Sequence, residues 1–229
     1  MAAGVRDLAA SFRRVVFVGT VGNHGRFEKK PYFKDKFNTA DWVIYKFLET
    51  LLADQRNVSF VIPRSPWVTA DIRGHEFFFA HGDAIRMFLQ FPWYDTARLI
   101  AQMTQLLVGQ GKKAPRYWGF GHYHNANVSQ LAHGEHLFTG SFKGSDEYSL
   151  NRLRAGGRPM QLFFGVHERR GVSFRYALDL SHASVGGQDR YLPLVRRARI
   201  PRPATASRED GGGPAAARVM TAKSQASPR

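Results

Sequence analysis

Cysteine is absent from the 229 residues of this chain. The protein therefore forms no disulfide bond and offers no thiolate to a metal ion. A metal would have to be held by His, Asn, Asp or Glu side chains, or by water. Because disulfide bonds are typical of secreted proteins, the lack of cysteine fits a cytoplasmic location, which we expect here.

Long apolar runs are missing as well. No stretch of the sequence approaches the roughly 20 residues that a membrane-spanning helix needs. The first residues include Arg6, Arg13 and Arg14, but they lack the apolar core and the cleavage site of a signal peptide. We therefore expect no membrane partner.

Acidic residues are few. The chain has 18 Asp and Glu against 33 Lys and Arg, a formal net charge of +15. Residues 196–229 contain eight basic and two acidic residues and carry +6, which leaves +9 for residues 1–195. This charge predicts an anionic partner, with nucleic acid as the first candidate. The alternative is a soluble surface with a high isoelectric point and no such partner.

The composition changes near residue 196. Over the whole chain 43% of residues are hydrophobic and 13% are aromatic, which predicts a globular fold. From residue 196 onward Arg, Pro, Ala, Gly and Ser dominate, and such a segment buries too little surface to offset the entropy of ordering. We expect a folded domain over residues 1–195 and a disordered basic tail over residues 196–229.

A Gly-His-X-His motif follows an expected strand at residues 117–120. Gly121 allows the backbone to bend, so that His122 and His124 can face one cation. Neutral imidazole is the commonest metal ligand in proteins. Alone the motif is weak evidence, because histidines at this spacing also occur for structural reasons.

Two other expected strands end in similar residues. Asn23 and His24 follow the apolar run at residues 15–18, and His81-Gly82-Asp83 follows the run at residues 76–80. In open α/β sheets, ligands bind just beyond the carboxyl ends of strands. Asp83 could orient a ligating histidine. Each loop alone could equally be a polar turn with nothing bound.

The remaining pattern predicts the scaffold. A helix capped by Asn38 or Thr39 should run to about residue 54 and face the core with six apolar side chains: Trp42, Val43, Phe47, Leu48, Leu51 and Leu52. Asp95 should cap a second helix. A hairpin is expected at residues 127–139, with His133 and His136 on its surface, and a last antiparallel pair at residues 161–166 and 172–180. The basic, aromatic loop at residues 27–37 could face a substrate or simply pack on the body.

Taken together, the motifs resemble the second half of the calcineurin-like metallophosphoesterase signature. The resemblance rests on Gly-Asn-His at 22–24, His81 and Gly-His-X-His at 121–124, in that order and spacing. The local pattern, with Gly-Asn-His-Gly-Arg, His-Gly-Asp and Gly-Ser-X-X-Gly-X-Asp-Glu-Tyr-Ser, is similar to phosphoesterases of phages and prophages. The resemblance covers roughly residues 5 to 180.

The resemblance implies an α/β fold, a four-layer α/β/β/α sandwich with a dinuclear metal site. By it, Asn23, His81 and His122 would bind one divalent metal and His124 the other. His24 would be catalytic beside the scissile phosphate, and Arg26 is a candidate substrate contact. The function implied is hydrolysis of phosphomono- or phosphodiesters, nucleotides or nucleic acid included, by an activated bridging hydroxide. Mixed nitrogen and oxygen ligands suit Mn first, with Fe, Zn and Ni as alternatives.

Two departures qualify this expectation. The Asp-X-His motif and the Gly-Asp-X-X-Asp (or -Asn) motif that open the family signature are missing, since Gly82-Asp83 is followed by Ala-Ile-Arg, so we expect the C-terminal part of a truncated or split enzyme. A separate N-terminal segment would then complete the site. The acidic residue that usually follows Asn-His is Gly25, so the orientation of His24 must come from elsewhere. The alternatives are an inactive remnant that binds nucleic acid and, more weakly, a mononuclear histidine-rich metal-binding protein of another kind.

Overall fold

A computed structural model describes residues 1–28, 38–88, 92–144 and 157–183 of the chain. By its contacts the chain divides into residues 1–192 and 193–229, and the second unit lies outside the described residues. The expected disordered tail and most of the loop at 27–37 also lie outside them, and so both stay predictions. Within the described ranges, no helix is long and apolar enough to cross a membrane.

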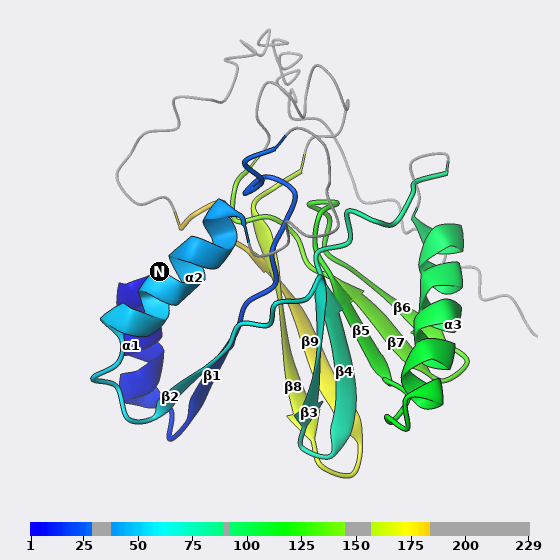
Figure 1. Ribbon diagram of the computed structural model, residues 1–229, viewed down its shortest axis with the longest axis horizontal. Helices are drawn as coiled ribbons and strands as arrows, with labels where there is room; N and C mark the ends of the chain where they lie inside the picture. Colours follow the sequence, from blue (N-terminus) through cyan, green and yellow to red (C-terminus); the bar gives the residue numbers. More distant parts are fainter. Residues whose placement is uncertain (29–37, 89–91, 145–156, 184–229) are drawn as a thin grey trace, which may run out of the picture. The chain divides into compact units, whose positions relative to one another are not determined.

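A five-stranded mixed sheet forms the centre of the fold (Figure 1). Its strand order is β3-β4-β5-β7-β6, in which β4, β5 and β7 run parallel and the outer strands pair antiparallel. The strands are β3 (Trp67–Ile72), β4 (His75–Ala80), β5 (Tyr117–Phe120), β6 (Asn127–Leu131) and β7 (Gly134–Phe138). All four residues of β5 are buried, as expected for the middle strand of a sheet covered on both faces.

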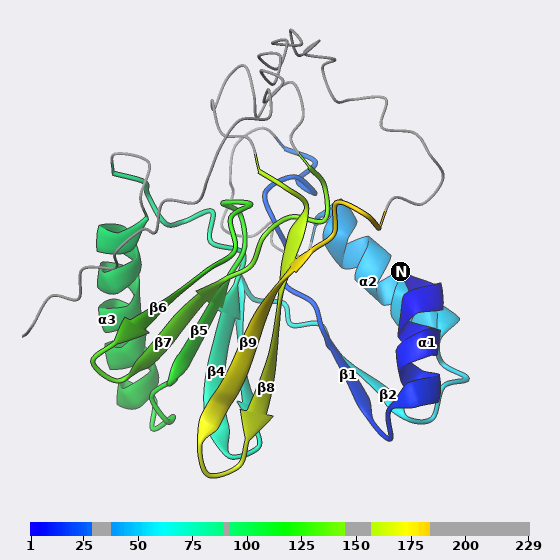
Figure 2. The same ribbon diagram turned by 180° about the vertical axis from the view of Figure 1, so that it is seen from behind.

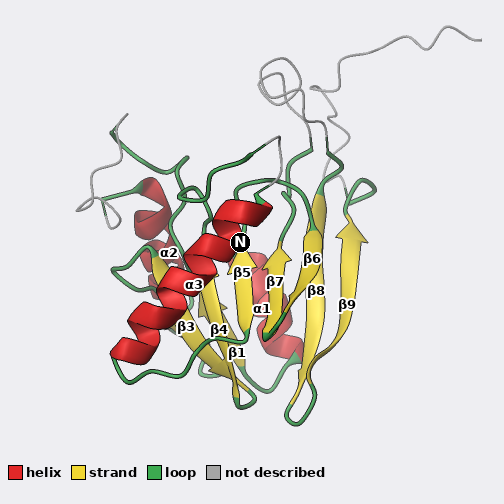
Figure 3. Cartoon of the chain, turned by 90° about the vertical axis from the view of Figure 1, so that its right-hand side faces the viewer, coloured by secondary structure: helices red, strands yellow, loops and turns green. Residues whose placement is uncertain are grey.

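Both faces of this sheet carry large apolar side chains. One face packs against α3 (Trp93–Gly109), which crosses it obliquely (Figure 3). The opposite face packs against the antiparallel pair β8 (Met160–His167) and β9 (Gly171–Asp179), visible in Figure 2. Trp118 on β5 points toward α3, and its neighbour Tyr117 points toward β8 and β9. This alternation along one strand follows from the period of two in a β-strand.

The N-terminal part builds a second, smaller core. Strands β1 (Val15–Val18) and β2 (Val58–Val61) pair in parallel, with Val15 opposite Val58. Helices α1 (Ala2–Ser11) and α2 (Ala40–Leu51) cover them. Thr39 caps α2, because its hydroxyl accepts the backbone N–H of Trp42 at 3.2 Å. The predicted α/β class is thus confirmed, as a mixed α/β fold around a central mixed sheet.

The predicted core face of α2 is largely wrong. Leu48 and Leu52 are buried, but Val43, Phe47 and Leu51 are 53%, 62% and 45% exposed. The helix rests on a sheet of two strands, whose narrow surface covers only one stripe of its side chains. An amphipathic pattern shows which face of a helix is apolar, but not how much of it a neighbour covers.

The predicted cap of the second helix is also wrong. Helix α3 begins at Trp93, with Pro92 at the capping position, so Asp95 lies inside its first turn. The Asp95 carboxylate instead accepts the backbone N–H of Arg86 at 2.7 Å and pairs with Arg98 at 2.9 Å. An acidic residue in the first turn still favours the helix through its dipole.

His136 is buried, whereas the sequence predicted it at the surface. It is 4% exposed, and its ring stacks on Trp93 with centroids 5.0 Å apart. Neither ring nitrogen has a hydrogen-bond partner among the described residues. Its strand, β7, begins at Gly134, so His136 falls in the buried stretch that ends the strand. His133 in the preceding turn is exposed, as predicted.

Candidate metal centre

Two of the predicted site residues follow neighbouring parallel strands. Ala80, the last residue of β4, pairs with Phe120, the last residue of β5. His81 and the Gly121-His122 turn therefore leave the sheet at one edge, and the Gly121 N–H donates to the His81 carbonyl at 2.9 Å. The buried sheet places these two imidazoles close together.

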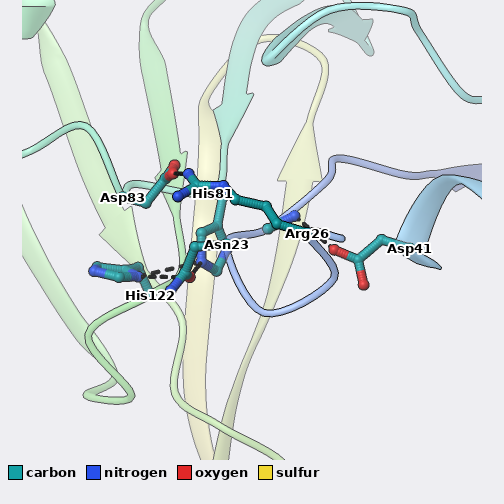
Figure 4. A network of polar contacts seen from close by, with 7 residues as sticks. Asn23, Arg26, Asp41, His81, Asp83 and His122 are labelled. Atoms are coloured by element: carbon teal, nitrogen blue, oxygen red, sulfur yellow. Dashed lines mark hydrogen bonds and ion pairs between the residues drawn. The ribbon is translucent and has the colours of Figure 1, made fainter. Parts of the chain in front are cut away.

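Asn23 reaches the same place from the loop that follows β1. Its Oδ1 lies 2.7 Å from Nε2 of His81 and 3.2 Å from Nδ1 of His122 (Figure 4). The two imidazole nitrogens are 3.2 Å apart. Gly22 permits this approach, since a Cβ there would lie 3.1–3.3 Å from three atoms of the His81 ring. Three potential ligand atoms thus form a small triangle.

The triangle fits the ligand face of one cation. Donors bound at about 2.0–2.2 Å to the same ion lie about 3.0–3.5 Å from each other. Two sides of the triangle fall in that range, and the third, 2.7 Å, is a hydrogen-bond distance. Within the described ranges no three His, Cys, Asp or Glu side chains gather to hold a metal, so the set depends on the Asn23 amide oxygen.

Both imidazoles are held in the neutral form that binds metals. Burial, followed by the charge of His122, lowers the pKa of His81 to about 4. Burial also lowers the pKa of His122. The carboxylates of Asp83 and Asp41 act on His81 in the opposite direction. At neutral pH each ring therefore keeps a lone pair available.

The turn after β5 has an uncommon backbone. His122 and His124 adopt positive φ angles of 69° and 56°, a region that residues other than glycine seldom occupy. Tyr123 between them anchors the turn, because its hydroxyl donates to the Ile85 carbonyl and its ring packs edge-on against Phe138. Such local strain is typical of functional sites.

His24 and His124 are both exposed, and they lie on the same loops as Asn23 and His122. After burial and Asp83, the charges of His124 and His24 are among the influences on the pKa of His122, in the lowering direction. The two side chains therefore lie within electrostatic range of the centre. The structure brings Asn23, His81 and His122 into direct contact.

Arg26 forms an ion pair with Asp83 beside the triangle (Figure 4). The two side chains are 21% and 15% exposed, so the pair is largely shielded from water. The sequence predicted a substrate contact for Arg26 and an orienting role for Asp83, and the pair links the first loop of the site to the second.

Asp41 is the residue near this site that the sequence analysis missed. Its carboxylate, in the first turn of α2, accepts the Gly22 N–H at 2.8 Å. The only signal in the sequence was indirect, namely that Gly25 stands where an acidic residue was expected. Nothing in the pattern of α2 pointed to Asp41 as its replacement.

No family model and no curated protein matches the chain. Several solved structures are similar to parts of it. Wild-type Vps29 from Entamoeba histolytica, complexed with Zn²⁺, is 14% identical, with 72% of this chain and 97% of that chain covered and a TM-score of 0.39. A novel archaeal phosphodiesterase is 12% identical, with 70% and 68% covered and a TM-score of 0.37.

A further similar structure is a predicted phosphoesterase from Streptococcus pneumoniae. It is 9% identical, with 77% of this chain and 89% of that chain covered and a TM-score of 0.37. All these scores lie below 0.5, so the likeness is partial, and the functional reasoning below rests on the geometry of the site.

Proposed function

We propose that this protein is a metal-dependent hydrolase of phosphomono- or phosphodiesters, of the calcineurin-like type that its motifs resemble. The observation that carries the proposal is the triangle formed by Asn23 Oδ1, His81 Nε2 and His122 Nδ1, with sides of 2.7–3.2 Å. It lies at the carboxyl ends of parallel strands, next to the shielded cation of Arg26. Neutral donors of this kind suit a metal cation, and the Arg26 guanidinium beside them, held by Asp83, would contact a phosphoryl oxygen.

Asn23, His81 and His122 would hold one divalent ion, and His124 would serve a second. Such ions polarise a phosphoryl oxygen and help to activate water. A donor set of one amide oxygen and two imidazoles favours Mn, Fe, Zn or Ni over Mg or Ca. Mn stays our first choice.

His24 and Arg26 would act on the substrate. His24 is exposed at the rim, where an imidazole can donate a proton to a leaving oxygen. Arg26 would contribute a guanidinium to bind phosphate oxygens, with Asp83 holding it in place. The substrate would be a phosphoester, with nucleotides and nucleic acid as candidate classes. A cytoplasmic location is part of the same proposal.

We also propose that a separate carboxylate-bearing segment completes the site. The triangle contains only neutral donors, and His124 alone would serve a second ion. Divalent ions in hydrolytic sites are commonly held by a carboxylate as well. The chain by itself would then bind at most one ion, weakly, and turn over slowly.

Metal titration on the purified chain tests the proposal. Mn²⁺ binding is measured by calorimetry, and hydrolysis of bis(4-nitrophenyl) phosphate is followed with Mn²⁺ present. We expect about one weak site, lost or weakened more than about tenfold in His81→Ala and His122→Ala. His133→Ala, at an exposed turn histidine, is the matched control and should bind like wild type. No binding by wild type, or equal binding by all variants, would show that the proposal is wrong.

Two bound ions with full turnover would instead show that the chain completes its own site. In that case only the separate segment is ruled out. Conversely, hydrolysis that appears only when a candidate segment is added would support the proposal that a separate segment completes the site.

Nucleic-acid binding without catalysis is the second candidate, and the net charge of +15 favours it. It predicts DNA binding that weakens steeply with salt and does not change in His81→Ala. The absence of DNA binding at low salt, or DNA binding that does not weaken as salt is raised, would exclude this function.

A further inference from the structure

The loop that carries Asn23 and His24 is fastened to the start of α2. The Ala40 N–H donates to the Gly25 carbonyl at 2.7 Å, and Arg26 forms an isolated β-bridge with Thr39. On the other side of Asn23, the Gly22 N–H donates to Asp41 Oδ2 at 2.8 Å. The first turn of the helix therefore holds the loop both before and after Asn23. Asp41 is seen beside this loop in Figure 4.

The Asp41 carboxylate also fills the space that a side chain at position 25 would need. A Cβ built on Gly25 would lie 2.5 Å from Asp41 Cγ and 2.6 Å from each carboxylate oxygen. Gly25 is buried and is not among the described glycines with positive φ. A side chain at position 25 is thus excluded by Asp41 and not by the backbone conformation, so the two positions are sterically complementary.

The second turn of α2 extends this contact. The Tyr45 hydroxyl donates to the Thr20 carbonyl at 3.2 Å, and its ring lies against Gly19, where a Cβ would be 2.8 Å away. The chain from the end of β1 to Arg26 therefore follows the helix over two turns. Among the residues of the helix start that make these contacts, only Asp41 carries a charge.

That charge matters because the ligand triangle is neutral. Asp41 does not belong to the triangle, yet its carboxylate accepts the N–H of Gly22, the residue before the ligand Asn23. Asp83 already pairs with Arg26, which offsets much of its charge. A carboxylate one hydrogen bond behind the ligand loop makes the site more favourable for a cation, as outer-shell carboxylates do in metal sites.

We infer that Asp41 is a positioning residue for the metal centre. Through the Gly22 N–H it holds Asn23 against His81 and His122, and from the space beside Gly25 it supplies the negative charge that the neutral ligands lack. The inference deepens the proposed function and rests on it. Asp41 itself contacts neither the ion nor the substrate.

Four variants of the full chain test this inference. Asp41→Asn keeps an oxygen for the Gly22 N–H but removes the charge, and Asp41→Ala removes both. Gly25→Asp alone should clash with Asp41. Gly25→Asp combined with Asp41→Ala moves the carboxylate from the helix to the loop. Glu49→Gln, at another acidic residue of α2, is the matched control, since Glu49 pairs only with Lys46 in the described structure.

Mn²⁺ affinity and thermal unfolding are measured for each variant. We expect affinity to fall about 10–100-fold in Asp41→Ala and less in Asp41→Asn, while Glu49→Gln binds like wild type. The double variant should recover most of the affinity that each single change loses. A merely structural role at the start of the helix would not predict this recovery, because residue 25 is outside α2.

The outcomes separate the two proposals. If wild type binds no Mn²⁺, the proposed function is wrong and the role of Asp41 falls with it. If wild type binds and Asp41→Ala binds equally well, only the inference about Asp41 is overturned. It is overturned too if the double variant binds no better than Asp41→Ala. Should Asp41→Ala fail to fold, Asp41→Asn against Glu49→Gln decides, and equal affinity would contradict the inference.

Discussion

The two halves of the candidate centre are held in different ways. His81 and His122 extend from β4 and β5, which lie inside a five-stranded sheet with apolar packing on both faces. Asn23 lies on a loop beyond a sheet of two strands, and polar contacts with the start of α2 hold that loop. We call His81, His122 and the strands that carry them the imidazole half, and Asn23 with its loop the amide half. The imidazole half depends on the main core, and the amide half depends mainly on hydrogen bonds to the start of α2.

This difference predicts how each half responds to substitution. Changes beneath the imidazoles should lower the stability of the whole domain, because the same side chains form its core. Changes in the polar contacts that hold the Asn23 loop should alter the site at a smaller cost in global stability, since they leave the main core intact. Stability and metal affinity should therefore separate in one half and change together in the other.

The largest effect is expected for Trp118→Ala in the imidazole half. Trp118 is 1% exposed and packs on Phe78 with ring centroids 4.8 Å apart. Truncating a buried aromatic side chain costs about 3–5 kcal/mol. We expect a loss of this size in urea unfolding, together with weakened Mn²⁺ binding. Phe142→Ala, at a residue that is 80% exposed, should change neither. A stable Trp118→Ala variant would contradict the comparison.

A smaller effect is expected for Arg26→Ala in the amide half. The Arg26–Asp83 pair is largely shielded, and losing a hydrogen bond to a charged group costs about 1–3 kcal/mol. Inhibition by inorganic phosphate should weaken as well, if Arg26 binds the substrate. Arg73→Ala removes an ion pair whose side chains are 59% and 58% exposed, and should cost at most about 1 kcal/mol. Equal costs for the two variants would show that shielding of the pair has no effect.

The imidazole half was largely predictable from the sequence. The expected strand at residues 117–120 becomes β5 with those bounds, and the run at residues 76–80 lies within β4, because aromatic residues in short apolar runs favour strands. Since β4 and β5 are parallel, the loops after them had to meet at one edge. The approach of His81 to His122 follows from that topology.

The amide half was only partly predictable. The role of Asp41 depends on where the first turn of α2 meets a loop that precedes it by 16–19 residues, and no local pattern encodes that contact. The exposure of the apolar side chains of α2 was equally unpredictable from local pattern, because it depends on the width of the two-stranded sheet on which the helix packs. Tertiary contacts, rather than propensities, decide both features.

The smallest effect is expected for His136, which should make the free energy of unfolding depend on pH. Its ring stacks on Trp93 and packs edge-on against Phe138, and burial lowers its pKa. The unfolded chain therefore takes up this proton more readily, and stability falls as the pH drops below about 6.5. Among the described residues the other histidines with lowered pKa are His81 and His122, which stay in place in a His136→Phe variant.

Urea unfolding at pH 7.5 and pH 5.0 isolates this contribution. Wild type should lose more stability between the two pH values than His136→Phe, which keeps an aromatic ring without a proton-binding site. The difference between the two proteins in this pH-dependent loss of stability is then due to His136, because the other titrating groups are common to both proteins. Equal losses would mean that the buried ring finds a partner when it is protonated, and that the imidazole half tolerates a charge in its core.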